Sequence, residues 1–174
     1  MGYSTIIFDL DNTLMDYDAA ASEALRKTLS EWKIHDDFSA VYKQYETINV
    51  RLWDEYERNL ISSEALRVER FKQLGTARNW TCSNWDQFSE NYLEYLSHQA
   101  PLYHDTISVL DALDGKFKLA IITNGISCVQ RGRMKNSIIS KYFPVFIISS
   151  EFGTAKPDPG IFEITLQKLK SSKE

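Results

Sequence analysis

The sequence predicts an α/β protein in which a parallel sheet is interrupted, after its first strand, by an inserted helical segment. Short apolar runs without polar alternation, at residues 6–8, 118–123 and 145–149, are typical of buried strands in such a sheet. Residues 17–100 instead show helical periodicity almost throughout, with one glycine and no proline. Strands that alternate with helices after this segment indicate a parallel sheet with right-handed connections.

The helical segment separates the first predicted strand from the second, so we interpret it as an insertion and not as a sequential domain. Pro101 marks the point at which the pattern returns to alternating helices and strands. We therefore expect a core formed by residues 1–16 and 101–174, and a helical domain formed by residues 17–100.

Composition and charge exclude several classes of protein. The chain has 174 residues, 43% of them hydrophobic, and a net charge of −4 without a basic cluster, which argues against nucleic-acid binding by phosphate neutralisation. The apolar runs are too short to span a membrane, and the N-terminus has no signal-peptide pattern. Cys82 and Cys128 have no metal-like or redox spacing, so we expect buried thiols and a cytoplasmic location.

Four apolar stripes at helical spacing predict four helices in the insertion, and short links between them predict a compact bundle. Asp36 and Asp37 can cap the second helix, Ser62 and Ser63 precede the third, and we expect Gly75 to end it. A capping box is expected before the fourth. The stripes are Ala21, Leu25, Leu29 and Trp32; Tyr45, Ile48, Leu52 and Tyr56; Leu66, Arg70, Phe71 and Leu74; and Phe88, Tyr92, Tyr95 and Leu96.

The core after Pro101 contains three further predicted helices. A short one holds residues 109–113, and a second is expected from a cap at Ser127 to about Ile139. The last follows a polar loop and holds residues 161–169.

Two carboxylates, Asp9 and Asp11, follow the first predicted strand directly, where open α/β sheets bind ligands. Carboxylates this close repel each other unless a cation or a shared proton relieves them. The simpler interpretation is that both residues stabilise a turn, since Asp favours turns. This interpretation explains a single Asp better than it explains the pair.

Polar residues at the ends of the next two strands complete a candidate phosphate site. Thr123 ends the second strand and Asn124 follows it, and backbone amides leading into the next helix can donate to phosphate oxygens. Lys156, after the third strand, supplies a positive charge to the same oxygens. Carboxylates and phosphate oxygens are also the ligands that Mg²⁺ prefers. Each motif alone is often structural, but three at successive strand ends predict phosphate chemistry beside a divalent cation.

These segments resemble three sequence motifs of the haloacid dehalogenase superfamily, at residues 6–14, 121–125 and 155–162. The resemblance implies a Rossmann-like core, and a helical insertion after the first motif is similar to the C1 type of cap domain. Within the superfamily the chain resembles the pyrimidine-nucleotidase-like group, on residues 45–53 and 60–63 of the cap and residues 121–125 and 145–162 of the core.

The resemblance also implies roles for single residues. Asp9 would be the nucleophile that forms an aspartyl-phosphate, and Asp11 the general acid and base. Thr123 and Lys156 would orient the phosphate and the nucleophile, while Asn124 and Gly125 would bind phosphate. The cofactor would be Mg²⁺, held by the Asp9 side chain and the Asp11 main-chain carbonyl.

One part of the family pattern is absent from the printed sequence. The family carries a fourth motif, an acidic pair after a further strand, but no apolar run followed by acids lies after Lys156. Glu151 is a poor substitute because the family's metal acid comes later in the chain. We therefore expect a truncated form whose C-terminal core strands are missing. If the printed sequence is the whole protein, we expect weak Mg²⁺ binding and low turnover. We also expect dimerisation or strand pairing at the exposed edge of the first strand.

The resemblance implies a small phosphorylated metabolite as the partner, with nucleoside 5′-monophosphates as the expected substrates. In the cap, Asn49, Trp53 and Arg70 are the candidate substrate contacts, since a ring can stack on a base and an amide can bind its edge. Such aromatics more often form a core, and Arg70 is as readily a solvated helix charge. Two alternatives stay open: a sugar-phosphate phosphatase or mutase on the same core, and a catalytically impaired binding protein.

Overall fold

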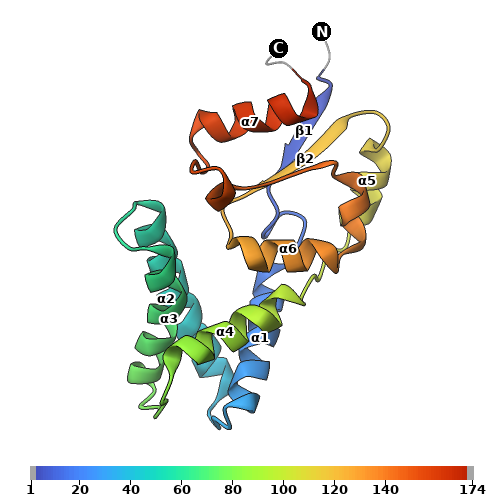
Figure 1. The fold of residues 1–174 in the computed structure, drawn as a ribbon. Helices are drawn as coiled ribbons and strands as arrows, with labels where there is room; N and C mark the ends of the chain where they lie inside the picture. The colour runs from blue at the N-terminus through green and yellow to red at the C-terminus, as the bar shows by residue number, and fades with distance from the viewer. Residues whose placement is uncertain (1–2, 172–174) are drawn as a thin grey trace. The chain divides into compact units, whose positions relative to one another are not determined.

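The computed structural model describes residues 3–171, which form a three-stranded sheet and a set of helices in the order that the sequence predicts (Figure 1). Of the described helices, none combines the length and the apolar character that crossing a lipid bilayer requires. The elements are β1 (Thr5–Phe8), α1 (Tyr17–Glu31), α2 (Phe38–Glu57), α3 (Ser63–Ala77), α4 (Trp85–Ser97), α5 (Thr106–Leu113), β2 (Lys118–Thr123), α6 (Ser127–Lys135), η1 (Ile138–Tyr142), β3 (Val145–Ile148), η2 (Ser149–Glu151) and α7 (Pro159–Leu169).

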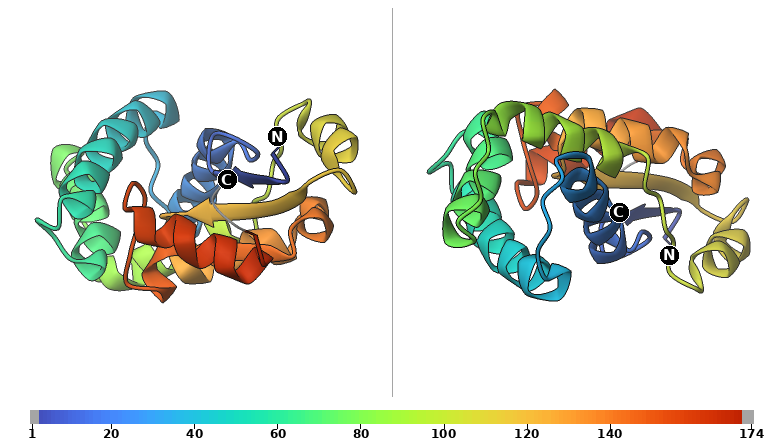
Figure 2. Two further views of the ribbon diagram at one scale, coloured as in Figure 1. Left: turned by 90° about the horizontal axis from the view of Figure 1, so that it is seen from above. Right: turned by 90° about the horizontal axis from the view of Figure 1, so that it is seen from below.

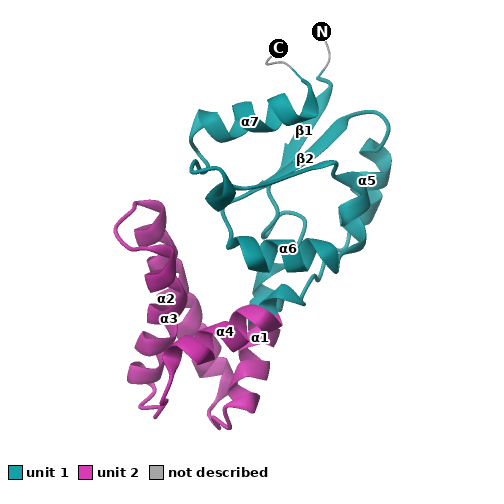
Figure 3. Ribbon diagram, in the orientation of Figure 1, with its two compact units in different colours: residues 1–21, 96–174 teal, residues 22–95 magenta. Residues whose placement is uncertain are grey.

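The chain divides into two compact units, residues 1–21 with 96–174 and residues 22–95 (Figure 3). The first unit holds the sheet and is called the α/β unit; the second is called the helical unit. Each predicted domain boundary differs from these limits by five residues, since residue 16 becomes 21 and residue 101 becomes 96.

The sheet is parallel, as predicted, with the strand order β1-β2-β3. Thr5 lies opposite Lys118, and Ala120 lies opposite Val145. The central strand is therefore β2, whose last five residues are all buried, whereas every residue of β1 is only partly buried. We expected β1 to be buried on both faces, but all its residues are only partly buried. In the described sheet it has a strand neighbour on one side alone, which agrees with the expected open edge. Pairing of another chain with that edge stays a prediction.

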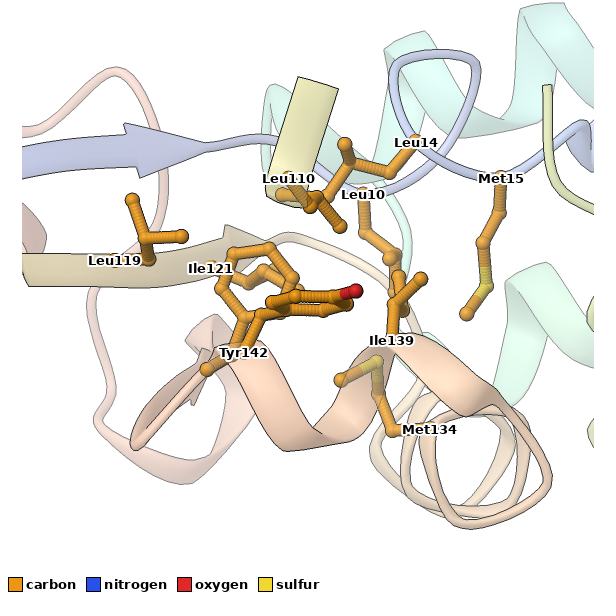
Figure 4. Packing of buried hydrophobic residues seen from close by; sticks show 10 residues of the cluster. Leu10, Leu14, Met15, Leu110, Leu119, Ile121, Met134, Ile139 and Tyr142 are labelled. Carbon is orange, nitrogen blue, oxygen red and sulfur yellow. The ribbon is translucent and has the colours of Figure 1, made fainter. Parts of the chain in front are cut away.

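Helices cover both faces of the sheet (Figures 1 and 2). On one face Leu119 and Ile121 of β2 pack with Leu110 of α5 and Met134 of α6 (Figure 4). Ile122, on the opposite face, packs with Ile147 of β3 and Ile161 of α7. Alternate residues of one strand thus belong to different clusters, which is why β2 reads as a continuous apolar run.

The helical unit has an aromatic core, and two of its predicted caps are confirmed. Asp37 accepts a hydrogen bond from Ser39 N, and Ser62 accepts one from Ala65 N. The prediction that Gly75 ends the third helix was wrong, because α3 continues to Ala77. A Cβ atom at Gly75 would overlap the ring of Trp85, so the glycine permits close packing.

Two smaller predictions in the α/β unit were also wrong. Ser127 does not cap α6, since Ile126 is the N-cap residue and the Ser127 hydroxyl donates to Glu151 instead. That helix ends at Lys135, and a separate 3₁₀ helix follows. The free thiols are not buried: Cys82 is partly exposed, and Cys128 lies on the exposed side of α6.

Candidate active site

The first part of the site is the loop that follows β1. Leu10 is fully buried, and its carbonyl accepts hydrogen bonds from Leu14 N and Met15 N, both at 3.0 Å. Asn12 has a positive φ of 56°, a conformation that asparagine tolerates better than most residues. The anchored Leu10 and this turn fix the backbone on both sides of Asp11. Hydrogen bonds within the loop therefore give it a defined backbone conformation.

Asp9 and Lys156 form an ion pair that joins the first motif to the third. The Lys156 ammonium donates to Asp9 Oδ1, and the Thr13 hydroxyl donates to Asp9 Oδ2 at 3.3 Å. The Asp9 side chain is 39% exposed and that of Lys156 is 26% exposed. A substrate can thus reach the carboxylate while the lysine holds its orientation.

Asn124 ties the loop of Lys156 to the end of β2. Its Nδ2 donates to the Lys156 carbonyl and its Oδ1 accepts from the Lys156 amide, both at 3.0 Å. This pair of bonds fixes the backbone from which the lysine side chain projects. Both ends of the Asn124 amide are engaged in this way, and its binding of phosphate stays a prediction.

Thr123 lies at the end of the central strand and is buried. Its hydroxyl oxygen accepts a hydrogen bond from Gly125 N at 3.1 Å and one from Gln130 Nε2 at 2.9 Å. A Cβ atom at residue 125 would overlap the Gln130 side chain, so the glycine leaves room for that contact.

Asp11 has partners that the sequence did not reveal. Gln130 Nε2 donates to Asp11 Oδ2 at 2.5 Å, and Arg133 Nη1 donates to Asp11 Oδ1. Both partners belong to α6 and both are buried. A signal was available: Gln130 and Arg133, three residues apart, share the buried face of α6 with Val129 and Met134. Polar residues on such a face call for a buried partner.

Glu151, which we judged a poor metal ligand, has partners of its own. Arg131 and Ser127 donate to its carboxylate, with Ser127 Oγ at 2.6 Å. The hydrogen bonds from the Arg131 guanidinium, and then from Ser127, hold the pKa of Glu151 below its usual range. An ionised carboxylate already bonded to an arginine is a weak competitor for Mg²⁺.

The described part of the site offers a divalent cation the Asp9 carboxylate and the backbone of the Asp11 segment, since the Asp11 carboxylate is already bonded to Arg133 and Gln130. Within residues 3–171 no three His, Cys, Asp or Glu side chains gather as a complete metal site. Mg²⁺ is commonly held by one or two carboxylates together with substrate phosphate and water, so Asp9 and the Asp11 segment fit such a partial ligand set.

The predicted cap contacts belong to the helical unit. Asn49 is 6% exposed and accepts a hydrogen bond from Arg70 Nη1 at 3.2 Å, and Arg70 is fully buried. Trp53 is partly exposed and its ring meets that of Tyr56 edge to face, with 5.7 Å between centroids. These contacts give Asn49 and Arg70 a structural role within their unit. Substrate binding by the three residues stays a prediction.

Comparison with known proteins identifies relatives along nearly the whole chain. The family model described as haloacid dehalogenase-like hydrolase matches residues 6–174. The pyrimidine 5′-nucleotidase PynA of Streptococcus pneumoniae is 33% identical over 170 residues, which cover 97% of this chain and 71% of that protein. The pyrimidine 5′-nucleotidase YjjG of Escherichia coli is 29% identical over 169 residues, covering 97% of this chain and 72% of that protein. The chain is thus shorter than these relatives.

A solved structure supports the same assignment. The putative hydrolase YfnB of Bacillus subtilis, described as bound to magnesium and as revealing interdomain movement, superposes with a TM-score of 0.90 at 25% identity. The match covers 99% of this chain and 75% of that one. Its agreement extends to the three-stranded parallel sheet and to the helical insertion between β1 and β2. The chain belongs to the haloacid dehalogenase-like hydrolases.

Proposed function

We propose that the protein is a magnesium-dependent phosphomonoester hydrolase that acts on nucleoside 5′-monophosphates through an aspartyl-phosphate. The main supporting observation is that two neighbouring carboxylates have different partners. Asp9 pairs with Lys156, whereas Asp11 is held by Gln130 and Arg133. Two acids with different partners on one loop suit different chemical roles. Two relatives named pyrimidine 5′-nucleotidases support the substrate class.

In the first step an oxygen of Asp9 attacks phosphorus, and the bond from phosphorus to the nucleoside oxygen breaks. Asp11, in its protonated form, gives its proton to the leaving oxygen and becomes a carboxylate. Lys156 orients the nucleophile and offsets negative charge on the phosphoryl oxygens. The products are a nucleoside and a phosphorylated Asp9.

In the second step Asp11 acts as a base. Its carboxylate removes a proton from water, and the resulting oxygen attacks phosphorus and breaks the bond to Asp9. Inorganic phosphate leaves, Asp9 returns as a carboxylate, and Asp11 is protonated again. Atoms and charges therefore balance over the cycle with one water consumed.

Asp9 and the Asp11 segment would hold the metal ion, together with phosphate oxygens of the substrate. When bound, Mg²⁺ supplies positive charge that lets an anionic nucleophile approach an anionic phosphate. Thr123 and the amides at the start of α6 would bind the remaining phosphate oxygens. Asn49, Trp53 and Arg70 of the helical unit are the proposed contacts for the nucleoside.

The deciding experiment measures phosphate release by wild type and by Asp9→Asn, with and without Mg²⁺. We expect turnover to fall by roughly 10⁴-fold or more in Asp9→Asn, because the nucleophile is lost. Asp105→Asn is the matched control, since its side chain is exposed and contacts His104. Turnover that survives Asp9→Asn would exclude the aspartyl-phosphate mechanism.

A substrate panel separates the proposed function from its alternatives. Pyrimidine and purine monophosphates, sugar phosphates and p-nitrophenyl phosphate are compared by kcat/KM. A preference for sugar phosphates, or phosphate transfer without net release, would favour the phosphatase or mutase alternative. Wild type that binds these compounds but turns over none of them at any Mg²⁺ concentration would favour an impaired binding protein.

A further inference from the structure

Arg133 is an unusual residue for the interior of the α/β unit. It lies on α6, and its side chain is fully buried. A buried guanidinium destabilises a fold unless its charge and its donors are paired. The reason for its burial should therefore be visible in the groups that it contacts.

The guanidinium donates hydrogen bonds to three acceptors. Nη1 donates to Asp11 Oδ1 and to Gln130 Oε1, the latter at 3.0 Å. Nε donates to the Gln99 carbonyl at 3.0 Å, which fixes the guanidinium from a second direction. Nη2 is buried and has no hydrogen-bond partner among the described residues. An unpaired buried donor lowers stability. The Tyr17 ring also lies near the guanidinium, with its centroid 5.9 Å from Cζ.

Gln130 completes the arrangement on the other carboxylate oxygen. Its Nε2 donates to Asp11 Oδ2 and also to the Thr123 hydroxyl, while its Oε1 accepts from Arg133. Each oxygen of Asp11 thus has its own donor, and the two donors are bonded to each other. The plane of the carboxylate is fixed by one rigid helix.

We propose that Arg133 and Gln130 are positioning residues that hold Asp11 in the orientation needed for proton transfer to the leaving group. The inference rests on the proposed function, because it requires Asp11 to act as the general acid. Arg133 acts through Asp11, and Gln130 acts through Asp11 and through the Thr123 hydroxyl. Loss of either donor removes one of the two bonds that fix the Asp11 carboxylate, and a misplaced acid slows the step that needs its proton.

The test compares two substrates whose leaving groups differ in their need for a proton. Uridine 5′-monophosphate loses an alkoxide, which must be protonated, whereas p-nitrophenyl phosphate loses a stable phenolate. The measured quantity is the ratio of kcat/KM for the first substrate to that for the second, taken on one preparation. Misfolded protein lowers both values equally, so the ratio does not depend on the active fraction. Both values report the steps up to aspartyl-phosphate formation, so the later role of Asp11 does not enter.

We expect Arg133→Met to lower the ratio by about tenfold, and Gln130→Met to lower it by less, in the direction of Asp11→Asn. Arg133→Lys keeps the charge but loses the fork of donors, and it should restore part of the ratio. Arg131→Met is the matched control, because Arg131 lies on the same helix and pairs with Glu151. Its ratio should equal that of wild type.

A ratio within about twofold of wild type in Arg133→Met would overturn the inference. If that variant does not fold, a ratio in Gln130→Met equal to that of the control Arg131→Met would overturn it. Such a result would leave these residues a purely structural role. Failure of the proposed function looks different. In that case Asp9→Asn keeps its turnover, or Asp11→Asn itself leaves the ratio unchanged.

Discussion

Arg133 of the α/β unit and Arg70 of the helical unit are both fully buried, yet they lie among different kinds of groups. Arg133 donates to the carboxylate of Asp11. Arg70 instead donates to Asn49 and lies 4.9 Å from the ring centroids of both Phe71 and Tyr92. The first contact orients a group proposed to move a proton. The second contributes packing and cation–π attraction to a core of rings.

The comparison indicates that buried polar side chains have different roles in the two units. In the α/β unit the polar network links three motifs at the strand ends and includes a donor without a partner among the described residues. In the helical unit a small bundle builds its interior from large rings, and the arginine fits between them. Substitutions in the first network should therefore change rates, and those in the second should change stability.

The largest expected effect on stability comes from Phe71→Ala in the helical unit. Phe71 is fully buried, and its ring lies 4.9 Å from that of Tyr92 and 5.1 Å from that of Phe88. Removing the ring leaves a cavity, and we expect the free energy of unfolding to fall by about 4 kcal/mol. Urea denaturation followed by circular dichroism measures this change. A loss below about 1 kcal/mol would show that the ring core is not closely packed.

Lys156→Met should lower activity and leave stability nearly unchanged. Its backbone bonds to Asn124 do not involve the side chain, so the loop should keep its position. We expect kcat to fall by about 10²–10³-fold, because the charge beside Asp9 is lost, with little change in the midpoint of urea denaturation. Steady-state kinetics with p-nitrophenyl phosphate provides the measurement. A clear loss of stability together with the loss of activity would contradict the proposed separation between substitutions that change rates and those that change stability.

Arg70→Met tests the comparison of the two arginines directly. We expect the free energy of unfolding to fall by about 2 kcal/mol, because the hydrogen bond to Asn49 and the contacts with two ring faces are lost. A purely structural Arg70 would leave the leaving-group ratio at the wild-type value, unlike Arg133→Met, whereas the proposed nucleoside contact predicts a lower ratio through weaker binding of uridine 5′-monophosphate. An increase in KM for uridine 5′-monophosphate at unchanged stability would instead support substrate binding by Arg70.

The smallest effect concerns an ion pair within the helical unit and its dependence on pH. Hydrogen bonds from Arg78, and then from Trp80, hold the pKa of Asp36 well below its usual range. A lowered pKa means that the carboxylate stabilises the folded state above about pH 4, and that this contribution is lost as the pH falls below that value. Asp36→Asn should therefore cost about 1 kcal/mol at pH 7 and much less at pH 2. Thermal melts of both proteins at several pH values check this; a difference that does not change with pH would contradict it.

The sequence predicted the parts of the fold that depend on local patterns. The run at residues 118–123 predicted β2 with its observed bounds, since a strand covered on both faces is apolar at consecutive positions, here residues 119–122. Gly75 was misinterpreted because a glycine that ends a helix and one that admits a neighbouring ring look alike in a sequence. Its partner Trp85 lies on the next helix, and only the packed structure brings the two together.

In the candidate site, too, local sequence patterns predicted some features, whereas others depend on packing. The sequence could select five site residues because each ends a predicted strand or lies in the loop after one: Asp9, Asp11, Thr123, Asn124 and Lys156. The polar side chains of Gln130 and Arg133 on an apolar helix face were a signal, but their partner could not be predicted, because they meet Asp11 across more than a hundred residues of chain. Such contacts depend on how α6 packs on the sheet, and helical periodicity gives the face of a helix but not its neighbour.

The pairing of β1 with β2 has a consequence for the order of events during protein synthesis. Thr5 pairs with Lys118, which leaves the ribosome 113 residues later, since 118 minus 5 is 113. At roughly 5–20 residues per second, the first strand waits on the order of ten seconds for its partner. The helical unit is continuous in the chain, from residue 22 to residue 95, and is complete before that partner exists. The domain inserted into the sheet can therefore fold before the sheet that carries it.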